Sequence, residues 1–282
     1  MSMKQKSVLC LAPGGLHRMA YTEWGAPSAP RTLICVHGLT RNGRDFDSVA
    51  LALEDGYRVI CPDIVGRGRS DWLSDEMHYQ NSIYLADLVT LVARVGVTEV
   101  DWLGTSMGGI LGMMMASMPG SPIKRLIVND VGPFLSKAAL ERIAGYTGNA
   151  PEFADIGGLE AYLRVVHAPF GNLTDQQWRH MAETSARPLN DGKVGLAYDP
   201  GIGENFRTGP LDDADMWRLW DAIRCPTLVI RGESSDLLLK DQAEEMTRRG
   251  PKAELTEIAG CGHAPALMAP DQIALIRDWL AA

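Results

Sequence analysis

Short, nearly continuous apolar runs recur along the chain. Those richest in β-branched residues span residues 32–36, 57–61, 100–103, 126–128 and 227–230. Runs of this length are typical of strands in a parallel sheet, which are apolar throughout because helices cover both faces of the sheet. The runs therefore predict a set of buried parallel strands.

Helical periodicity lies between these runs. Apolar side chains share one helix face over residues 84–95 and again over residues 273–280, where they recur every three or four positions. Strands that alternate with helices predict an α/β fold with a mostly parallel, doubly wound sheet flanked by helices. A further apolar run, residues 7–12, stops at Pro13 and is too short for a secretory signal, so we expect it to be the first strand.

The alternation of strands and helices breaks after residues 131–133 and resumes near residues 223–226. The stretch between them is too long for a simple loop and contains many helix-forming residues. We therefore expect an inserted helical cap at residues 133–223, with residues 1–132 and 224–282 forming the core. The aromatic residues of the predicted cap are Phe134, Phe153, Phe170, Trp178, Trp217 and Trp220.

Charge and cysteine content argue against several kinds of partner. The net charge is −8 and lysines and arginines form no cluster, which disfavours nucleic acid. No apolar segment approaches the length of a membrane span, so we expect no membrane partner. The five cysteines are odd in number and form no Cys-x-x-Cys pair, which predicts free thiols in a reducing cytoplasm. We expect a cytoplasmic monomer or homodimer that acts on a small molecule.

The sequence Gly-Thr-Ser-Met-Gly at residues 104–108 contains a candidate nucleophile, Ser106. It directly follows a predicted strand and precedes a stretch that is compatible with a helix. In this context Gly-x-Ser-x-Gly is the nucleophile elbow, a tight turn that presents the serine hydroxyl at the edge of the sheet. Side chains at positions 104 and 108 would collide with neighbouring backbone in so tight a turn.

His263 is the candidate base for Ser106. A serine hydroxyl is a poor nucleophile at neutral pH, so it needs a base to take its proton and a carboxylate to orient that base. His263 lies in the glycine-rich loop 260–265, between the strand-like residues 253–258 and the last helix. A loop in this position can bring a base over an elbow serine.

The carboxylate that would orient His263 has three candidates. Asp236 and Glu233 follow the predicted strand at 227–230, and Asp130 follows the strand at 126–128. The chain order serine, aspartate, histidine favours Asp236. Asp130 is the main competitor, because a triad requires a position in space and not a particular strand.

Two backbone amides are candidates for an oxyanion hole, which must donate hydrogen bonds to the tetrahedral intermediate. The N–H of Met107 comes directly after the nucleophile, at a helix N-terminus that favours negative charge. The N–H of Leu39 lies in the loop after the strand at 32–36. We expect the neighbouring His37 to support this loop and not to take part in catalysis.

Taken together, these motifs resemble those of the α/β-hydrolase superfamily, from residue 17 to residue 282. They are His-Gly at 37–38, Pro-Asp-Ile-Val-Gly-Arg-Gly-Arg-Ser-Asp at 62–71, the elbow, the segment 232–236 and Gly-His at 262–263. The resemblance implies the α/β-hydrolase fold. The serine at the elbow separates the chain from the haloalkane dehalogenase and epoxide hydrolase branches, which use an aspartate there. The single glycine after His37 departs from the His-Gly-Gly-Gly of one lipase and esterase branch, which disfavours bulky tertiary-alcohol esters.

The predicted activity is hydrolysis of small to medium carboxylic esters through an acyl-enzyme, as in carboxylesterases. We expect no cofactor and no metal, because no His-Glu-x-x-His motif or histidine-carboxylate cluster is visible in the sequence. A lactonase, or a hydrolase that cleaves a carbon-carbon bond of ring-cleavage products, would use the same triad. The second alternative needs polar groups for a dienoate carboxylate, which Arg164, Arg187 or Arg207 could provide. A cofactor-free haloperoxidase or perhydrolase and a ligand receptor on the same scaffold are weaker alternatives.

Overall fold

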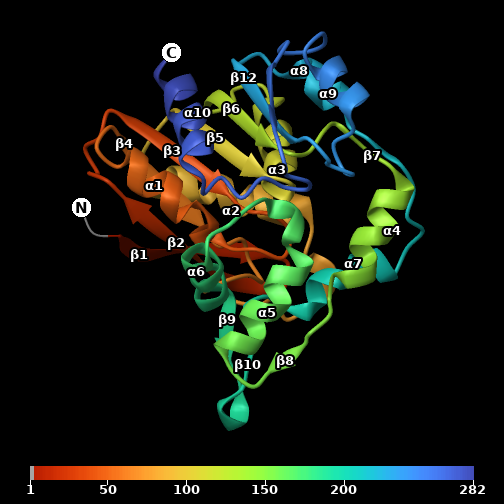
Figure 1. Ribbon diagram of the computed structural model, residues 1–282. Coiled ribbons are helices and arrows are strands. Elements are labelled where there is room, and N and C mark those ends of the chain that lie inside the picture. The colour runs from red at the N-terminus through yellow and green to blue at the C-terminus, as the bar shows by residue number, and fades with distance from the viewer. Residues whose placement is uncertain (1–2) are drawn as a thin grey trace.

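The computed structural model describes residues 3–282 and is built around an eight-stranded sheet (Figure 1). The order of strands is β1-β2-β4-β3-β5-β6-β12-β13. Neighbouring strands from β4 to β13 are parallel, whereas β2 is antiparallel to β1 and to β4. The strands are β1 Lys4–Ala12, β2 Gly15–Trp24, β3 Arg31–Val36, β4 Tyr57–Pro62, β5 Val100–Thr105, β6 Ile123–Asn129, β12 Thr227–Gly232 and β13 Glu254–Ile258.

The predicted α/β fold is confirmed. Each predicted buried run lies within one of the parallel strands β3, β4, β5, β6 and β12, and the run at residues 7–12 lies within β1. The antiparallel strand β2 was not predicted. It joins the hairpin β1-β2 to the parallel part of the sheet.

Alternate residues of the central strands pack on opposite faces of the sheet. Leu33 and Cys35 of β3 belong to the apolar cluster that includes α1 (Asp47–Leu53) and α10 (Pro270–Ala281). Ile34 and Val36 belong to the cluster that includes α2 (Asn81–Val95), α3 (Met107–Ala116) and α9 (Lys240–Met246). Because both faces are covered, the strands have no polar side, and this is why they form continuous apolar runs.

The segment between β6 and β12 leaves the sheet and returns to it at the neighbouring strand. Its last helix, α8 (Trp217–Ala222), packs on α3, and Trp220 is fully buried in the core. We therefore use the name cap for residues 134–215. The elements of the cap are β7 Phe134–Leu135, α4 Lys137–Tyr146, β8 Glu152–Phe153, α5 Ile156–Val166, α6 Asp175–Ser185, β9 Ala186–Pro188, β10 Val194–Leu196, α7 Glu204–Arg207 and β11 Ala214–Asp215.

The cap lies beyond the carboxyl ends of the parallel strands, with α5 and α6 side by side (Figure 1). Buried residues of these two helices, among them Leu159, Leu163, Trp178 and Met181, form a small apolar cluster of their own. The strands β8, β10 and β9 form a separate three-stranded sheet beside it. Across residues 3–282, no helix combines the length and the apolarity needed to cross a bilayer.

Candidate active site

Ser106 has a strained backbone conformation between β5 and α3. Its φ is 52° and its ψ is −114°, a combination that residues with a side chain rarely adopt. A Cβ atom on Gly104 would lie 2.1 Å from the carbonyl oxygen of Gly108, and one on Gly108 would lie 2.0 Å from that of Val36. The predicted reason for the two glycines of the elbow is therefore confirmed.

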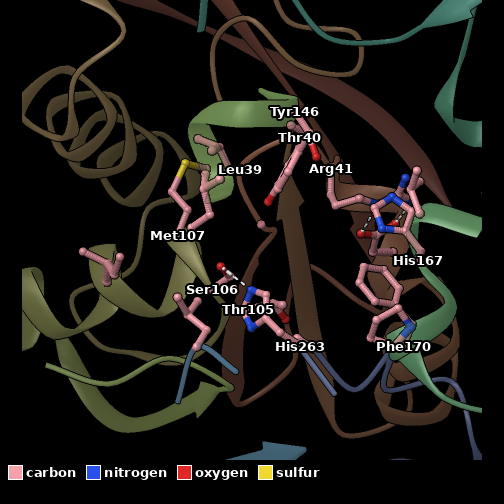
Figure 2. Close-up of a pocket in the computed structure, with 18 of the residues that line it drawn as sticks. Leu39, Thr40, Arg41, Thr105, Ser106, Met107, Tyr146, His167, Phe170 and His263 are labelled. Atoms are coloured by element: carbon pink, nitrogen blue, oxygen red, sulfur yellow. Dashed lines mark hydrogen bonds and ion pairs between the residues drawn. The ribbon is translucent and has the colours of Figure 1, made fainter. Parts of the chain in front are cut away.

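A chain of hydrogen bonds joins Ser106, His263 and Asp130. Nε2 of His263 lies 3.0 Å from Oγ of Ser106, and Nδ1 lies 2.8 Å from Oδ2 of Asp130 (the first contact is drawn in Figure 2). Asp130 directly follows β6, and His263 lies in the loop after β13. With Nδ1–H donating to the carboxylate, Nε2 is the nitrogen that accepts from the serine hydroxyl. The geometry is that of a nucleophile, a base and an orienting acid.

The carboxylate of Asp130 is fully buried and accepts hydrogen bonds from two further groups. The backbone N–H of Gly232 donates to Oδ1 over 2.7 Å, and the hydroxyl of Ser235 donates to Oδ2 over 2.6 Å. Gly232 is the last residue of β12, the strand next to β6, and Ser235 lies in the turn that follows it. The segment that we expected to supply the acid therefore holds the acid in place instead.

Asp236 does not contact His263, so its predicted role is wrong in this geometry. Its side chain is 58% exposed and forms an ion pair with Arg142 of α4 at 3.0 Å. Glu233, the other candidate from this segment, accepts from the backbone N–H of Gly260. Because residues 233–235 turn back toward Asp130, Asp236 is carried away from the histidine.

The predicted oxyanion donors lie beside Ser106. Leu39 and Met107 both line the same cavity as the serine, and Figure 2 shows them next to each other above it. Within residues 3–282, neither backbone N–H donates a hydrogen bond to another group. Two unpaired amides next to a nucleophile are available for the oxygen of a reacting carbonyl group.

The buried side chain of His37 fixes the loop that contains Leu39. Nδ1 of His37 lies 2.7 Å from the carbonyl oxygen of Gly38, and Nε2 accepts from the N–H of Ile64 at 3.0 Å. Burial lowers the pKa of His37 to about 3, with the nearby charges of Arg67 and Arg41 adding to the shift, so the ring is neutral. The predicted structural role of His37 agrees with these contacts.

Arg67 is fully buried, and the hydrogen bonds of its guanidinium group within residues 3–282 go to carbonyl, hydroxyl and sulfur atoms and not to a carboxylate. Its Nε donates to the carbonyl oxygen of Leu39 at 2.9 Å, and Nη2 lies 3.8 Å from Sδ of Met107. The guanidinium group thus contacts both candidate oxyanion residues, and its charge favours an anion between them. We did not predict this role, because an arginine between two glycines is typical of an exposed turn.

The site opens into a cavity of about 1180 Å³ between the core and the cap. Its wall is mainly apolar. The contributing apolar side chains include Ile110 of the core and Leu140, Ile143, Leu163, Phe170, Met181, Leu196 and Phe206 of the cap. A cavity of this kind suits a small organic molecule with few charged groups.

The charged side chains that line this cavity form pairs. Arg41 donates to the Asp45 carboxylate through Nε and Nη2, so its charge is balanced locally. Arg142 is balanced by Asp236 in the same way. His167 of the cap lies beside Arg41 in Figure 2. We had singled out neither Arg41 nor His167, since nothing in the local sequence distinguishes them from surface residues.

The cap arginines that we considered for a dienoate carboxylate lie outside the cavity wall. Arg164 pairs with Glu160 and Asp175, Arg207 pairs with Glu204, and Arg187 stacks on the ring of Trp72. These positions therefore do not support the idea that a cap arginine binds the dienoate carboxylate of a carbon-carbon hydrolase substrate.

One group of metal-ligand types does occur away from the cavity. Cys10, His17 and Asp87 are buried together, with their ligand atoms within 4.8 Å of one another. Nε2 of His17 lies 2.7 Å from Oδ2 of Asp87, which links the hairpin β1-β2 to α2. Our expectation that the chain has no histidine-carboxylate cluster is wrong here. The five cysteines are all free thiols, as predicted.

Comparison with known proteins gives the family. A model described as "Alpha/beta hydrolase family" matches residues 33–274. The chain belongs to the alpha/beta hydrolase family. A solved alpha/beta hydrolase from Novosphingobium aromaticivorans superimposes with a TM-score of 0.87 at 36% identity, covering 100% of this chain and 99% of that one.

Relatives of this alpha/beta hydrolase also indicate its chemistry. It is 48% identical over 276 residues to the 3-hydroxybutyrate-oligomer hydrolase of Cupriavidus necator, covering 95% of this chain and 94% of the relative. It is 25% identical over 232 residues to the 2-(acetamidomethylene)succinate hydrolase of Mesorhizobium japonicum, covering 82% and 81%. The protein is thus a hydrolase, and the first relative is named for the hydrolysis of 3-hydroxybutyrate oligomers.

Proposed function

We propose that this hydrolase cleaves carboxylic esters of short hydroxy acids, with oligomers of 3-hydroxybutyrate as the substrate class. The observation that carries the proposal is the hydrogen-bonded chain Ser106–His263–Asp130 at the floor of an apolar cavity. The similarity to an oligomer hydrolase across nearly the whole chain supports the choice of substrate.

In the first half of the reaction Ser106 attacks the ester carbonyl carbon. His263 takes the proton of the hydroxyl group as the new carbon-oxygen bond forms, and Asp130 holds the imidazole in position and stabilises its positive charge. The carbonyl oxygen becomes negative between the N–H groups of Leu39 and Met107, and the charge of Arg67 stabilises it further. The bond to the alcohol then breaks, and His263 gives its proton to the departing oxygen.

In the second half of the reaction water replaces the alcohol. His263 takes a proton from the water molecule, which attacks the acyl carbon attached to Ser106. The second tetrahedral intermediate uses the same two amides. Its collapse returns the proton to the serine oxygen and releases the free acid.

The test is hydrolysis of the linear dimer and trimer of 3-hydroxybutyrate, followed by chromatography of the monomer that is released. Ser106→Ala should lower kcat/KM by a factor on the order of 10³ or more, because the nucleophile is lost. Ser117→Ala, at the other end of α3, is the matched control and should keep full activity. Activity that survives in Ser106→Ala would refute the proposed mechanism.

A substrate panel separates the proposal from its alternatives. Lactones and simple alkyl esters contain the same reacting group. They should be hydrolysed more slowly than the oligomer if the oligomer is the substrate. No turnover of any ester by the wild type, together with tight ligand binding, would support a receptor instead.

A further inference from the structure

A histidine of the cap faces the cavity without hydrogen-bond partners for its ring. His167 follows α5, and its ring stacks on Phe170 with the centroids 4.4 Å apart (Figure 2). In the part of the chain that the structure describes, neither Nδ1 nor Nε2 forms a hydrogen bond. His167 is half-buried and lines the cavity, so a bound molecule that displaces water from the ring leaves its nitrogens unpaired unless one of its own groups pairs with them.

The ring of His167 is neutral. Burial lowers its pKa well below the ordinary value of 6.5, and the positive charge of Arg41 acts in the same direction. A neutral imidazole presents one donor nitrogen and one acceptor nitrogen. Around it the cavity wall is mostly apolar, with Leu163 and Val166 on the preceding helix α5.

The charges near His167 do not favour a carboxylate. Arg41 is the nearby cation, and it already binds both carboxylate oxygens of Asp45. An anionic ligand would therefore meet a negative charge together with the positive one. A neutral group that both donates and accepts, such as a hydroxyl, matches the imidazole best.

We infer that His167 determines specificity by binding the free hydroxyl group of a hydroxyacyl ester. The inference rests on the proposed function, because it concerns the acyl part that Ser106 receives. A 3-hydroxybutyrate oligomer has a hydroxyl at one end and a carboxylate at the other. His167 selects the hydroxyl end, so the unit that carries the free hydroxyl is the one transferred to Ser106.

Two esters that differ by one hydroxyl group test the inference. Ethyl 3-hydroxybutyrate and ethyl butyrate have the same leaving group, and a pH-stat measures the hydrolysis of both. The wild type should prefer the hydroxy ester by at least about tenfold in kcat/KM, because a site built for a hydroxyl rejects the analogue that lacks it. In His167→Phe the ratio should fall to within about threefold of unity.

Matched variants exclude a general effect of changing the cap. His167→Gln retains a donor and an acceptor and should recover part of the preference. His180→Phe makes the same substitution in α6, where the ring pairs with Asp47 outside the cavity wall, and should keep the wild-type ratio. A wild-type ratio near unity, or a full preference in His167→Phe, would overturn the inference.

Binding to an inactive enzyme gives the same answer without turnover. In Ser106→Ala, calorimetry should find tighter binding of ethyl 3-hydroxybutyrate than of ethyl butyrate, and the added His167→Phe change should remove the difference. Equal affinities in both variants count against His167. Residual hydrolysis by Ser106→Ala would count against the proposed function, which keeps the two failures distinct.

Discussion

At the scale of single residues, the buried carboxylate of Asp130 is held in an orientation that positions the ring of His263. The backbone N–H of Gly232, the hydroxyl of Ser235 and the ring of His263 all bind it. The first two fix its orientation, and the third uses that orientation to direct Nε2 at Ser106. Its backbone φ of 56° places it at a sharp turn immediately after β6.

Replacing Asp130 by asparagine should therefore remove most of the activity. The amide cannot balance an imidazolium charge and can hold the ring in the wrong tautomer, so we expect kcat to fall by about 10³–10⁴-fold. Steady-state kinetics on the 3-hydroxybutyrate dimer measures the loss, and circular dichroism shows whether the variant folds.

Asp236→Asn is the control for this change. Asp236 lies at an exposed ion pair with Arg142, and such pairs contribute about 0–1 kcal/mol. We expect kcat to change by less than about tenfold. If Asp236→Asn were the more damaging of the two substitutions, Asp130 would not be the orienting acid.

The residues of the proposed triad were predictable to different degrees. Ser106 and His263 lie in glycine-rich motifs whose local sequence restricts their conformation. The acid was limited to a few candidates, but the choice depended on the turn at residues 233–235. That turn directs Ser235 toward Asp130 and Asp236 toward solvent, and its direction results from packing between β6 and β12 and not from the local sequence.

At the scale of elements, the elbow depends on the close approach of α3 to β3 and β5. The main chain of Gly108 runs against the carbonyl group of Val36, with no space for a methyl group. A side chain at this position would move the N-terminus of α3, and with it the N–H of Met107. The same contact thus serves both the packing of the core and the position of a proposed oxyanion donor.

We expect Gly108→Ala to destabilise the protein strongly. A Cβ atom 2.0 Å from a carbonyl oxygen forces a backbone shift, which should cost on the order of 4 kcal/mol or more. The melting temperature should fall by roughly 10 °C, or the variant should be insoluble. Gly56→Ala, where a Cβ would meet nothing within 4 Å, is the control for differential scanning calorimetry. Equal melting temperatures for the two variants would contradict the steric argument.

The strands differed in how well their sequences identified them. The parallel strands are buried on both faces, so their apolar composition alone was sufficient to identify them as strands. In β2 the buried residues include Glu23, which pairs with Lys6 and Arg58, and His17, which pairs with Asp87. From the sequence alone, charged residues that are buried in pairs are predicted to be exposed, because their partners lie far away along the chain.

At the scale of the whole molecule, buried histidines make stability depend on pH. His37 stays neutral in the folded state because its pKa is lowered to about 3, whereas an unfolded histidine protonates near 6.5. Between these values the unfolded chain binds more protons than the folded one. The contribution of His37 to stability is therefore lost as the pH falls below 6.5.

Urea denaturation of wild type and His37→Gln at pH 7 and pH 5 measures this contribution. The wild type should lose about 2 kcal/mol more than the variant over this interval, which is the linkage free energy of one histidine. Asp63 acts in the opposite direction, since burial raises its pKa to about 6 and its ionisation opposes folding as the pH rises. It is present in both proteins, so the comparison cancels it. Identical losses would show that His37 protonates in the folded state.

The adjacency of β6 and β12 in the sheet has a consequence for how this enzyme could diversify. Because the chain leaves and re-enters the sheet at neighbouring strands, the two ends of the inserted segment stay close together whatever its length. Doubling the length of such a loop costs only about 0.6 kcal/mol of closure entropy. Exchanging the segment for that of another family member should therefore alter which molecules are accepted while the strands beneath retain the machinery of bond cleavage.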